Sequence, residues 1–249
     1  MPHDPIVIPA ADGDCTVHVL TPTDRGTGPW PAVIIYMDAL AIRPALIGVA
    51  QRLADAGYCV LLPDLFYRFG PYPALVPKEV FKGDLFAVIG PMYATTSPGL
   101  AARDSAAFLD WLAGRPDIAR LPAGVVGFCM GGGMALATAG TYPDRIAAAA
   151  SFHGGRLVSD APDSPHRYAP EIRAEVLVAG ADNDDSYPAA MHEQLMAAFD
   201  AAGVHHHSEI YAGAAHGWMQ PDFPVYDHDA AERGWSAMLD LFARNLHAA

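Results

Sequence analysis

A cysteine flanked by glycines constrains this chain more than any other feature of the sequence. Residues 127–131 read Gly-Phe-Cys-Met-Gly, with Val125-Val126 before them and the alanine-rich run 134–137 after them. A β-branched run, one nucleophilic side chain between two glycines and a helix-forming run predict a nucleophile elbow, which is a tight, strained turn between a strand and a helix. The glycines are needed because a Cβ at either position would collide with the turn or with the adjacent strand. Cys129 is therefore the candidate nucleophile.

A core-filling cysteine or a nucleotide-binding loop would suit this segment less well. A free cysteine is usually a small apolar filler of the core, and the strand, turn and helix context of Cys129 reverses that expectation. A phosphate-binding loop requires Lys-Ser or Lys-Thr after its glycines, but Met134-Ala135 follow here. The consecutive glycines at 131–133 lack the Gly-x-Gly-x-x-Gly spacing of a dinucleotide site. No Gly-x-Ser-x-Gly occurs elsewhere in the chain, so no serine competes for the role.

Composition limits the kinds of partner. The chain has 249 residues, of which 52% are hydrophobic, and this is enough for one large α/β core. Its formal net charge of -13 disfavours nucleic acid and anionic membranes through repulsion. No apolar run approaches the roughly 18 residues that cross a membrane, no signal peptide is visible in residues 1–25, and the three cysteines lack metal-binding spacing. We expect a cytoplasmic enzyme for a small molecule, without metal, as a monomer or small homo-oligomer.

Strand-like and helix-like segments alternate along the whole chain. This alternation is typical of an α/β fold, and we predict a single domain over residues 1–249 with a mostly parallel sheet flanked by helices on both faces. One long stretch, 64–98, reads as an irregular loop and is expected to wall a pocket. Besides the strand that enters the elbow, the expected strands are 15–20, 31–37, 59–62, 146–152, 175–179 and 209–211, and the expected helices are 44–56, 99–113, 189–202 and 231–246.

Polar residues after the later strands complete a candidate site, because chemistry in a parallel sheet gathers at the carboxyl ends of its strands. The strand at 175–179 is followed by Asp182, Asp184 and Asp185, and the strand at 209–211 is followed by His216. A nearby imidazole favours the thiolate form of a cysteine, and a carboxylate fixes the tautomer of that imidazole. Cys129, one of the three aspartates and His216 therefore form a candidate triad.

Several segments give the chain a resemblance to the dienelactone hydrolase family. They are 127–132 around the elbow, 151–155 (Ser-Phe-His-Gly-Gly), 184–188 (Asp-Asp-Ser-Tyr-Pro) and 215–217 (Ala-His-Gly), and 63–68 also looks like a segment of that family. The resemblance covers about residues 5–245 and implies one α/β-hydrolase domain with a Cys-Asp-His triad and no cofactor. In the family the aspartate stands four residues before a proline, and Pro188 thereby selects Asp184.

The resemblance and the fold class extend the site beyond the triad. This fold forms its oxyanion hole from the backbone N–H after the nucleophile and from one in the early strand-to-helix loop, which here belong to Met130 and Ala39. The family also keeps an acidic residue that faces the resting thiol. Asp38 occupies this place as a candidate thiol switch, where the founding members carry glutamate. The alternative for Asp38 is a cap at the entry of the next helix.

Substrate-binding residues are expected near the triad and in the long loop. Family members that open dienelactone hold its carboxylate with arginines, one of them four residues after the catalytic histidine, where this chain has Gln220. An amide lacks the charged, bidentate grip of a guanidinium. We therefore expect hydrolysis of a small ester or lactone through an acyl-thioester, with short uncharged esters preferred over dienelactone. The candidate pocket residues are Phe66, Tyr67, Arg68, Phe128, Phe152, Trp218 and Gln220.

Three alternative functions remain open. A glutamine amidotransferase also carries cysteine on an elbow, but its His-x-Glu ends a strand, whereas 207–209 (His-Ser-Glu) open one. A thiol redox sensor usually needs a resolving cysteine, for which Cys59 is the candidate, and a non-catalytic binding module would need a broken triad. Two histidine features receive no catalytic role: His153 after its strand, and the tract 205–207, which reads as a solvated turn rather than a metal site.

Overall fold

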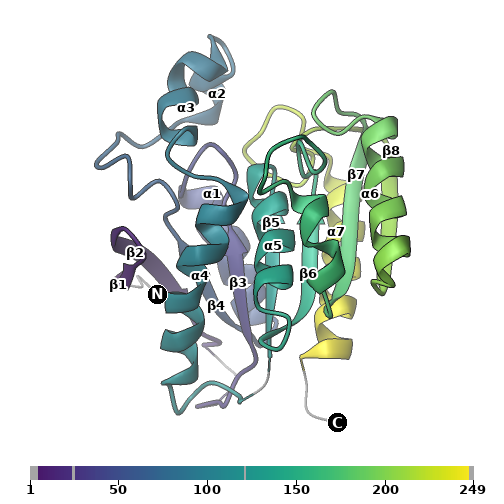
Figure 1. Cartoon of the computed structure of the whole chain (residues 1–249). Coiled ribbons are helices and arrows are strands. Elements are labelled where there is room, and N and C mark those ends of the chain that lie inside the picture. Colours follow the sequence, from purple (N-terminus) through teal and green to yellow (C-terminus); the bar gives the residue numbers. More distant parts are fainter. Residues whose placement is uncertain (1–4, 24–25, 121, 247–249) are drawn as a thin grey trace.

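A sheet of eight strands runs through the computed structural model, which describes residues 5–23, 26–120 and 122–246 (Figure 1). The strand order is β1-β2-β4-β3-β5-β6-β7-β8, in which β1, β2 and β4 pair antiparallel and every pair from β4 to β8 is parallel. The predicted α/β fold with a mostly parallel sheet is thereby confirmed. The strands are β1 (Ile6–Ala10), β2 (Gly13–Leu20), β3 (Ala32–Tyr36), β4 (Cys59–Pro63), β5 (Ala123–Phe128), β6 (Ile146–Phe152), β7 (Glu175–Asn183) and β8 (His206–Ala215).

Helices cover both faces of the sheet (Figure 1). The first face carries α1 (Pro44–Asp55) and α7 (His228–Asn245), which are joined by an ion pair between Arg52 and Glu232 at 2.6 Å. The second face carries α4 (Pro98–Ala113), α5 (Met130–Thr141), α6 (Ala189–Ala202) and the 3₁₀ helix η1 (Pro165–Glu171). Because both faces are covered, every residue of β3, β4 and β5 is buried, which explains their continuous apolar runs.

Two short helices stand above the sheet at the top of Figure 1. They are α2 (Pro77–Val80) and α3 (Leu85–Tyr93), and they lie inside the stretch 64–98 that the sequence predicted to be an irregular loop. The prediction is wrong here because Pro91 lies inside α3 and hides the helical pattern, although Asp84 caps that helix by accepting a hydrogen bond from Ala87 N at 3.1 Å. No helix in the described part of the chain is long and apolar enough to span a bilayer.

The sequence also missed β1 and η1, and it predicted too short a strand for β8. β1 lies at the edge of the sheet and pairs with β2 alone, so its apolar pattern is short. β8 is the opposite edge, and only Tyr211 and Ala214 of its ten residues are buried. An edge strand with one covered face carries a weaker hydrophobic signal than a central strand.

The turn between β5 and α5 is sterically closed around its glycines. A Cβ on Gly127 would lie 1.8 Å from Gly131 O, and a Cβ on Gly131 would lie 2.2 Å from Tyr36 O at the end of β3. Both distances are far inside van der Waals contact and both involve backbone atoms, which cannot move aside. The predicted reason for the two glycines is therefore confirmed, and the first turn of α5 is pressed against the end of the neighbouring strand.

We predict that Gly131→Ala lowers the free energy of unfolding by about 3 kcal/mol or more, because the added methyl must displace the backbone of β3. The control is Gly48→Ala in α1, where the new methyl meets no atom within 4 Å. There the exchange should raise the free energy of unfolding by roughly 0.5–1 kcal/mol, since glycine is unfavourable inside a helix. Urea unfolding of both variants measures the difference, and equal stabilities would contradict the steric account.

Candidate active site

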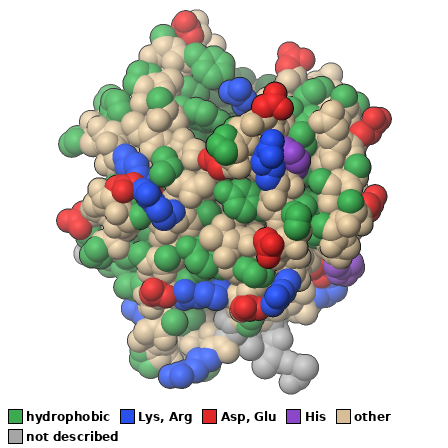
Figure 2. Space-filling model, in the orientation of Figure 1, with side chains coloured by type: hydrophobic (Ala, Val, Ile, Leu, Met, Phe, Trp, Pro, Cys, Tyr) green, Lys and Arg blue, Asp and Glu red, His purple; other side chains and the backbone are tan. Residues whose placement is uncertain are grey.

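A cavity of about 670 Å³ opens at the carboxyl edge of the sheet. The candidate triad lines it, together with Ala39 and Met130. The stretch 64–98 forms its apolar wall, as expected, and Figure 2 shows hydrophobic side chains gathered on the surface over α2 and α3. The residues of this wall are Phe81, Leu85, Phe86, Ile89 and Phe223, the last from the segment after β8.

Cys129 is held at the start of α5 with a backbone φ of 55°, which a residue with a side chain rarely adopts. Its backbone N–H lies 3.1 Å from Phe152 O and 3.2 Å from His153 Nδ1, so the elbow is tied to the end of β6. The Cys129 side chain is partly exposed, whereas Cys15 and Cys59 are completely buried. Burial raises the pKa of each of these other two thiols to about 12.

His216 follows β8 and contacts both other members of the candidate triad. Its Nδ1 lies 2.7 Å from Asp184 Oδ2, at the end of β7. Burial lowers the pKa of His216, but the interactions with Cys129 and Asp184 outweigh it and raise this pKa to about 10. For Asp184, burial raises the pKa, but the contacts with His216 and Ser186 outweigh burial and hold this pKa below its ordinary value. The imidazole is thus set to carry a positive charge between two groups that favour it.

The geometry also separates the three aspartates. Asp184 is 6% exposed and accepts hydrogen bonds from Ser186 N at 2.8 Å and from Ser186 Oγ at 2.6 Å, besides its contact with His216. Asp182 is exposed and accepts from Gly213 N at 2.9 Å. Asp185 is exposed as well, at the rim of the cavity. Of the three, Asp184 is the one in contact with the imidazole.

Asp38 is fully buried beside Ala39 and is held by an arginine. Arg43 Nη1 and Nη2 donate to its two carboxylate oxygens at 2.8 and 3.0 Å, and Leu40 N donates to Oδ1 at 2.8 Å. Burial raises the pKa of Asp38, and the charge and hydrogen bonds of Arg43 only partly offset this rise. Arg43 is itself the residue before α1, so the alternative role of Asp38 as a cap of that helix is wrong. The carboxylate accepts from Leu40 N instead, and the backbone O of Asp38 accepts from Ala41 N at 3.2 Å. The negative charge expected to face the thiol is paired with Arg43.

The expected aromatic lining of the cavity is wrong. Phe66, Phe128, Phe152 and Trp218 are at most 1% exposed and pack into the core, and none of them lines this cavity. Trp218 stacks on Tyr211 at a centroid distance of 4.3 Å, and Phe128 stacks on Phe152 at 5.9 Å. Phe128 and Phe152 end the buried strands β5 and β6, and their side chains point into the core between the sheet and the helices. Being next to a site residue in the sequence therefore does not place a side chain in the cavity.

The polar residues predicted for the pocket also lie elsewhere. Tyr67 Oη and the Arg68 guanidinium both donate to the buried carboxylate of Asp104, at 2.9 Å and at 2.7–2.9 Å, and Arg68 also pairs with Asp12. Gln220 is completely buried and does not line the cavity. The residue four positions after His216 therefore says nothing about how a substrate is held. The expected preference for uncharged substrates, which rested on Gln220, loses its basis.

Sequence reasoning missed several residues of the site. Ser186 bridges Asp184 and His216, with its Oγ 3.0 Å from His216 Nδ1. His153, which received no role, is fully buried and accepts the Cys129 N–H, and its ring centroid lies 5.4 Å from that of His216. Burial, followed by the nearby His216 charge, lowers the pKa of His153 well below its ordinary value, so it stays neutral. The sequence signal that could have identified His153 is its position directly after β6, at the carboxyl edge of the sheet. Arg43 and Arg156 lie between strands and helices, where no sequence pattern marks them.

The fold is that of an α/β-hydrolase: a mostly parallel sheet, a glycine-flanked turn between β5 and α5, and an aspartate and a histidine after β7 and β8. The family model described as "Dienelactone hydrolase family" matches residues 16–246. The chain therefore belongs to the dienelactone hydrolase family of hydrolases.

Individual relatives agree with this assignment. A protein of Methylorubrum extorquens is 27% identical over 241 residues, which are 95% of this chain and 79% of that protein. A carboxymethylenebutenolidase of Rhodococcus opacus is 25% identical over 242 residues, covering 90% of this chain and 84% of its own. The crystal structure of a dienelactone hydrolase-like promiscuous phosphotriesterase from metagenomic libraries matches with a TM-score of 0.77 and 25% identity, over 99% of this chain and 100% of that one.

We predict that Asp184→Asn lowers the pKa of His216 toward its ordinary value of 6.5. A raised pKa means that the charged imidazole stabilises the fold fully below pH 6.5 and that this contribution is lost as pH rises through about 10. The gap in unfolding free energy between wild type and Asp184→Asn should therefore narrow between these two pH values. NMR titration of His216 and urea unfolding against pH measure both effects. Asp185→Asn is the matched control, and an equal effect in it would contradict the assignment of Asp184.

Proposed function

We propose that the protein hydrolyses a small ester or lactone through Cys129, with Asp184 and His216 completing the triad. The observation that carries the proposal is the position of His216, whose Nδ1 lies 2.7 Å from Asp184 and whose raised pKa reflects contact with Cys129. A thiol paired with an imidazole has thiolate character, and the thiolate is the nucleophilic form. Membership of the dienelactone hydrolase family supports an ester or lactone as the substrate class.

The proposed reaction has two steps. The Cys129 thiolate attacks the carbonyl carbon, a C–S bond forms, and the C–O bond to the leaving group breaks while the other ring nitrogen of His216 gives its proton to the leaving oxygen. Water then loses a proton to His216 and attacks the thioester carbonyl. The C–S bond breaks, the acid leaves and the thiolate returns. Asp184 keeps the imidazole in one tautomer and orientation through both steps.

The backbone N–H groups of Met130 and Ala39 are the proposed oxyanion hole. Both residues line the cavity beside Cys129, and close packing of Gly131 against Tyr36 O brings the start of α5 next to the loop that contains Ala39. We further propose that Asp38 acts on the thiol only through this loop, since Arg43 and Leu40 N occupy both of its carboxylate oxygens. The pH profile of Cys129 alkylation should then be unchanged in Asp38→Asn, and a shifted profile would support a direct thiol switch.

The alternative functions find less support. The segment 207–209 begins β8, at the edge of the sheet opposite to Cys129, as predicted, so it offers no His-x-Glu partner for a glutaminase. Cys59 begins β4, is completely buried and has a pKa raised by burial to about 12, which makes it a poor resolving cysteine. Cys15, Cys59 and Cys129 are all free thiols, which suits the reducing cytoplasm that the sequence suggested.

We predict that Cys129→Ala abolishes hydrolysis of p-nitrophenyl acetate while the far-UV circular dichroism stays native, because alanine fits where cysteine stands. His216→Ala should be nearly as inactive, since members of a triad act as one unit. Cys59→Ala is the matched control and should retain activity. Iodoacetamide should label Cys129 at least tenfold faster than Cys15 or Cys59, whose thiols are buried and protonated. Retained activity in Cys129→Ala would refute the proposed nucleophile.

A further inference from the structure

One face of α3 forms a stripe of large uncharged side chains along the catalytic cavity. Leu85, Ile89 and Tyr93 line that cavity at a spacing of four residues, which places them one above another on the same face of the helix. Phe86, three residues before Ile89, widens the stripe. The stripe is about 12 Å long from its first residue to its last, because an α-helix rises by roughly 1.5 Å per residue.

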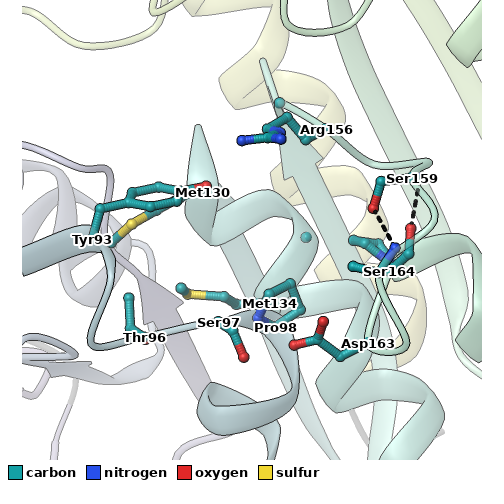
Figure 3. Close-up of a pocket in the computed structure, with 14 residues that line it drawn as sticks. Tyr93, Thr96, Ser97, Pro98, Met130, Met134, Arg156, Ser159, Asp163 and Ser164 are labelled. Atoms are coloured by element: carbon teal, nitrogen blue, oxygen red, sulfur yellow. Dashed lines mark hydrogen bonds between the residues drawn. The ribbon is translucent and has the colours of Figure 1, made fainter. Parts of the chain in front are cut away.

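The candidate nucleophile lies at the C-terminal end of this stripe. Tyr93 lines the catalytic cavity together with Cys129 and Met130, and Figure 3 shows Tyr93 and Met130 in the wall of a neighbouring cavity that both residues share. Burial raises the pKa of Tyr93, and the charge of Cys129 raises it further, so the phenol lies near the thiol. Leu85 and Phe86 come about two helical turns earlier and form the far end. A chain bonded to a carbonyl carbon at Cys129 can therefore extend along α3 toward them.

The charges around the cavity leave this stripe apolar. Every residue of the stretch 64–98 that lines the cavity is uncharged. The buried carboxylates of Asp38 and Asp184 are already paired with cations, and Asp185 and Arg156 are exposed to water at the rim. Moving a charge from water to an apolar wall is unfavourable, whereas moving a methylene group there is favourable. The stripe therefore favours a hydrocarbon chain over a charged one.

The far end of the stripe presents large apolar side chains to water. Phe86 is 71% exposed although it lines the cavity, and Phe81, directly after α2, is 39% exposed. An edge contact with Phe223, at a centroid distance of 5.0 Å, ties Phe81 to the segment after β8. A hydrocarbon chain that reaches this end covers apolar surface that is otherwise in contact with water, which favours its binding.

A different part of the cavity is polar. Asn183, Asp185 and Ser186, at and after the end of β7, line it beside His216. In the proposed reaction His216 gives its proton to the leaving oxygen, so the alcohol part of the ester lies on this polar side. The acyl part then lies along α3.

We propose that the stripe on α3 is an acyl-binding subsite and that the substrates are neutral esters of acids with about six to eight carbons, a range set by the length of the stripe. The inference rests on the proposed ester hydrolysis and adds the length and polarity of the acyl group. The cavity volume of about 670 Å³ agrees, because it lies within the range of sites that enclose ligands much larger than an acetate ester.

The test compares p-nitrophenyl esters that differ only in the acyl chain: acetate, butyrate, hexanoate and octanoate. They share one leaving group, so their relative kcat/KM values report on the acyl subsite. We expect kcat/KM to rise at least about tenfold from acetate to octanoate, since each methylene that is fully buried improves binding by up to about fourfold. A kcat/KM that stays level or falls beyond butyrate would overturn the proposal.

Phe86→Ser and Val88→Ser form a matched pair on α3. Phe86 lines the cavity, whereas Val88 is 41% exposed on the same helix and lies outside the cavity lining. Phe86→Ser should lower the ratio of kcat/KM for octanoate to kcat/KM for acetate about threefold or more, because the far end of the stripe loses apolar surface. Val88→Ser should leave this ratio unchanged. An equal effect of the two substitutions would contradict the assigned path of the chain.

Mono-p-nitrophenyl adipate tests the polarity of the subsite. It has as many acyl carbons as the hexanoate ester, but its chain ends in a carboxylate. Partway along α3 this carboxylate meets Ile89, which is buried and apolar. We expect kcat/KM for the adipate to be at least about tenfold lower than for the hexanoate, because the charge must leave water. An adipate that reacts as fast as the hexanoate, or faster, would overturn the apolar subsite.

Alkylation separates this inference from the proposed function, because it needs the thiol and the subsite but no hydrolysis. N-hexyl iodoacetamide should label Cys129 severalfold faster than iodoacetamide does, and Phe86→Ser should reduce this advantage. The absence of a hexyl advantage, while ester hydrolysis still depends on Cys129, would overturn the subsite alone. Hydrolysis that continues in Cys129→Ala would refute the proposed function, and a hexyl advantage in alkylation would then still support the apolar subsite.

Discussion

The site depends on the close packing of Gly127 and Gly131 against the backbone around them, which leaves no room for a side chain at either position. Gly127 and Gly131 have no room for a Cβ, so β5 and the start of α5 come together around Cys129 and press against the end of β3. This contact fixes the φ of 55° at Cys129 and directs its side chain to the carboxyl edge of the sheet. Parallel pairing of β5, β6, β7 and β8 then delivers His153, Asp184 and His216 to the same edge.

Two buried charge networks hold the loops at this edge. Asp184 and His216 join the ends of β7 and β8, and Arg43 joins the loop after β3 to Asp222 in the segment after β8, with an Nε–Oδ2 distance of 2.7 Å. The Arg43 guanidinium also lies 5.0 Å from the ring centroid of Phe223, which lines the catalytic cavity. Removing one partner from a buried ion pair leaves an uncompensated charge, so both networks strongly favour one arrangement of the loops.

The sequence predicted the parallel core and the three triad candidates because both follow local rules: buried strands are continuous apolar runs, and reactive residues follow strand ends. It did not predict the cavity walls. Phe128 and Phe152 directly precede Cys129 and His153 yet point into the core. Phe81, directly after α2, and Phe86, in the helix α3 that Pro91 disguised, line the cavity instead. The partnership of Asp38 with Arg43 and the position of Arg156 depend on how loops pack together in space, which periodicity along the chain does not encode.

The central claim is that Cys129 forms a covalent acyl intermediate, and peptide mapping of the enzyme quenched in acid during turnover of p-nitrophenyl acetate tests it most directly. Acid stops thioester hydrolysis by protonating the groups that activate water. The account predicts an acetyl group on the peptide that contains Cys129, which hydroxylamine removes at neutral pH. Turnover with no acetyl group on that peptide, or with a stable one on another nucleophile that appears at the turnover rate, would contradict it.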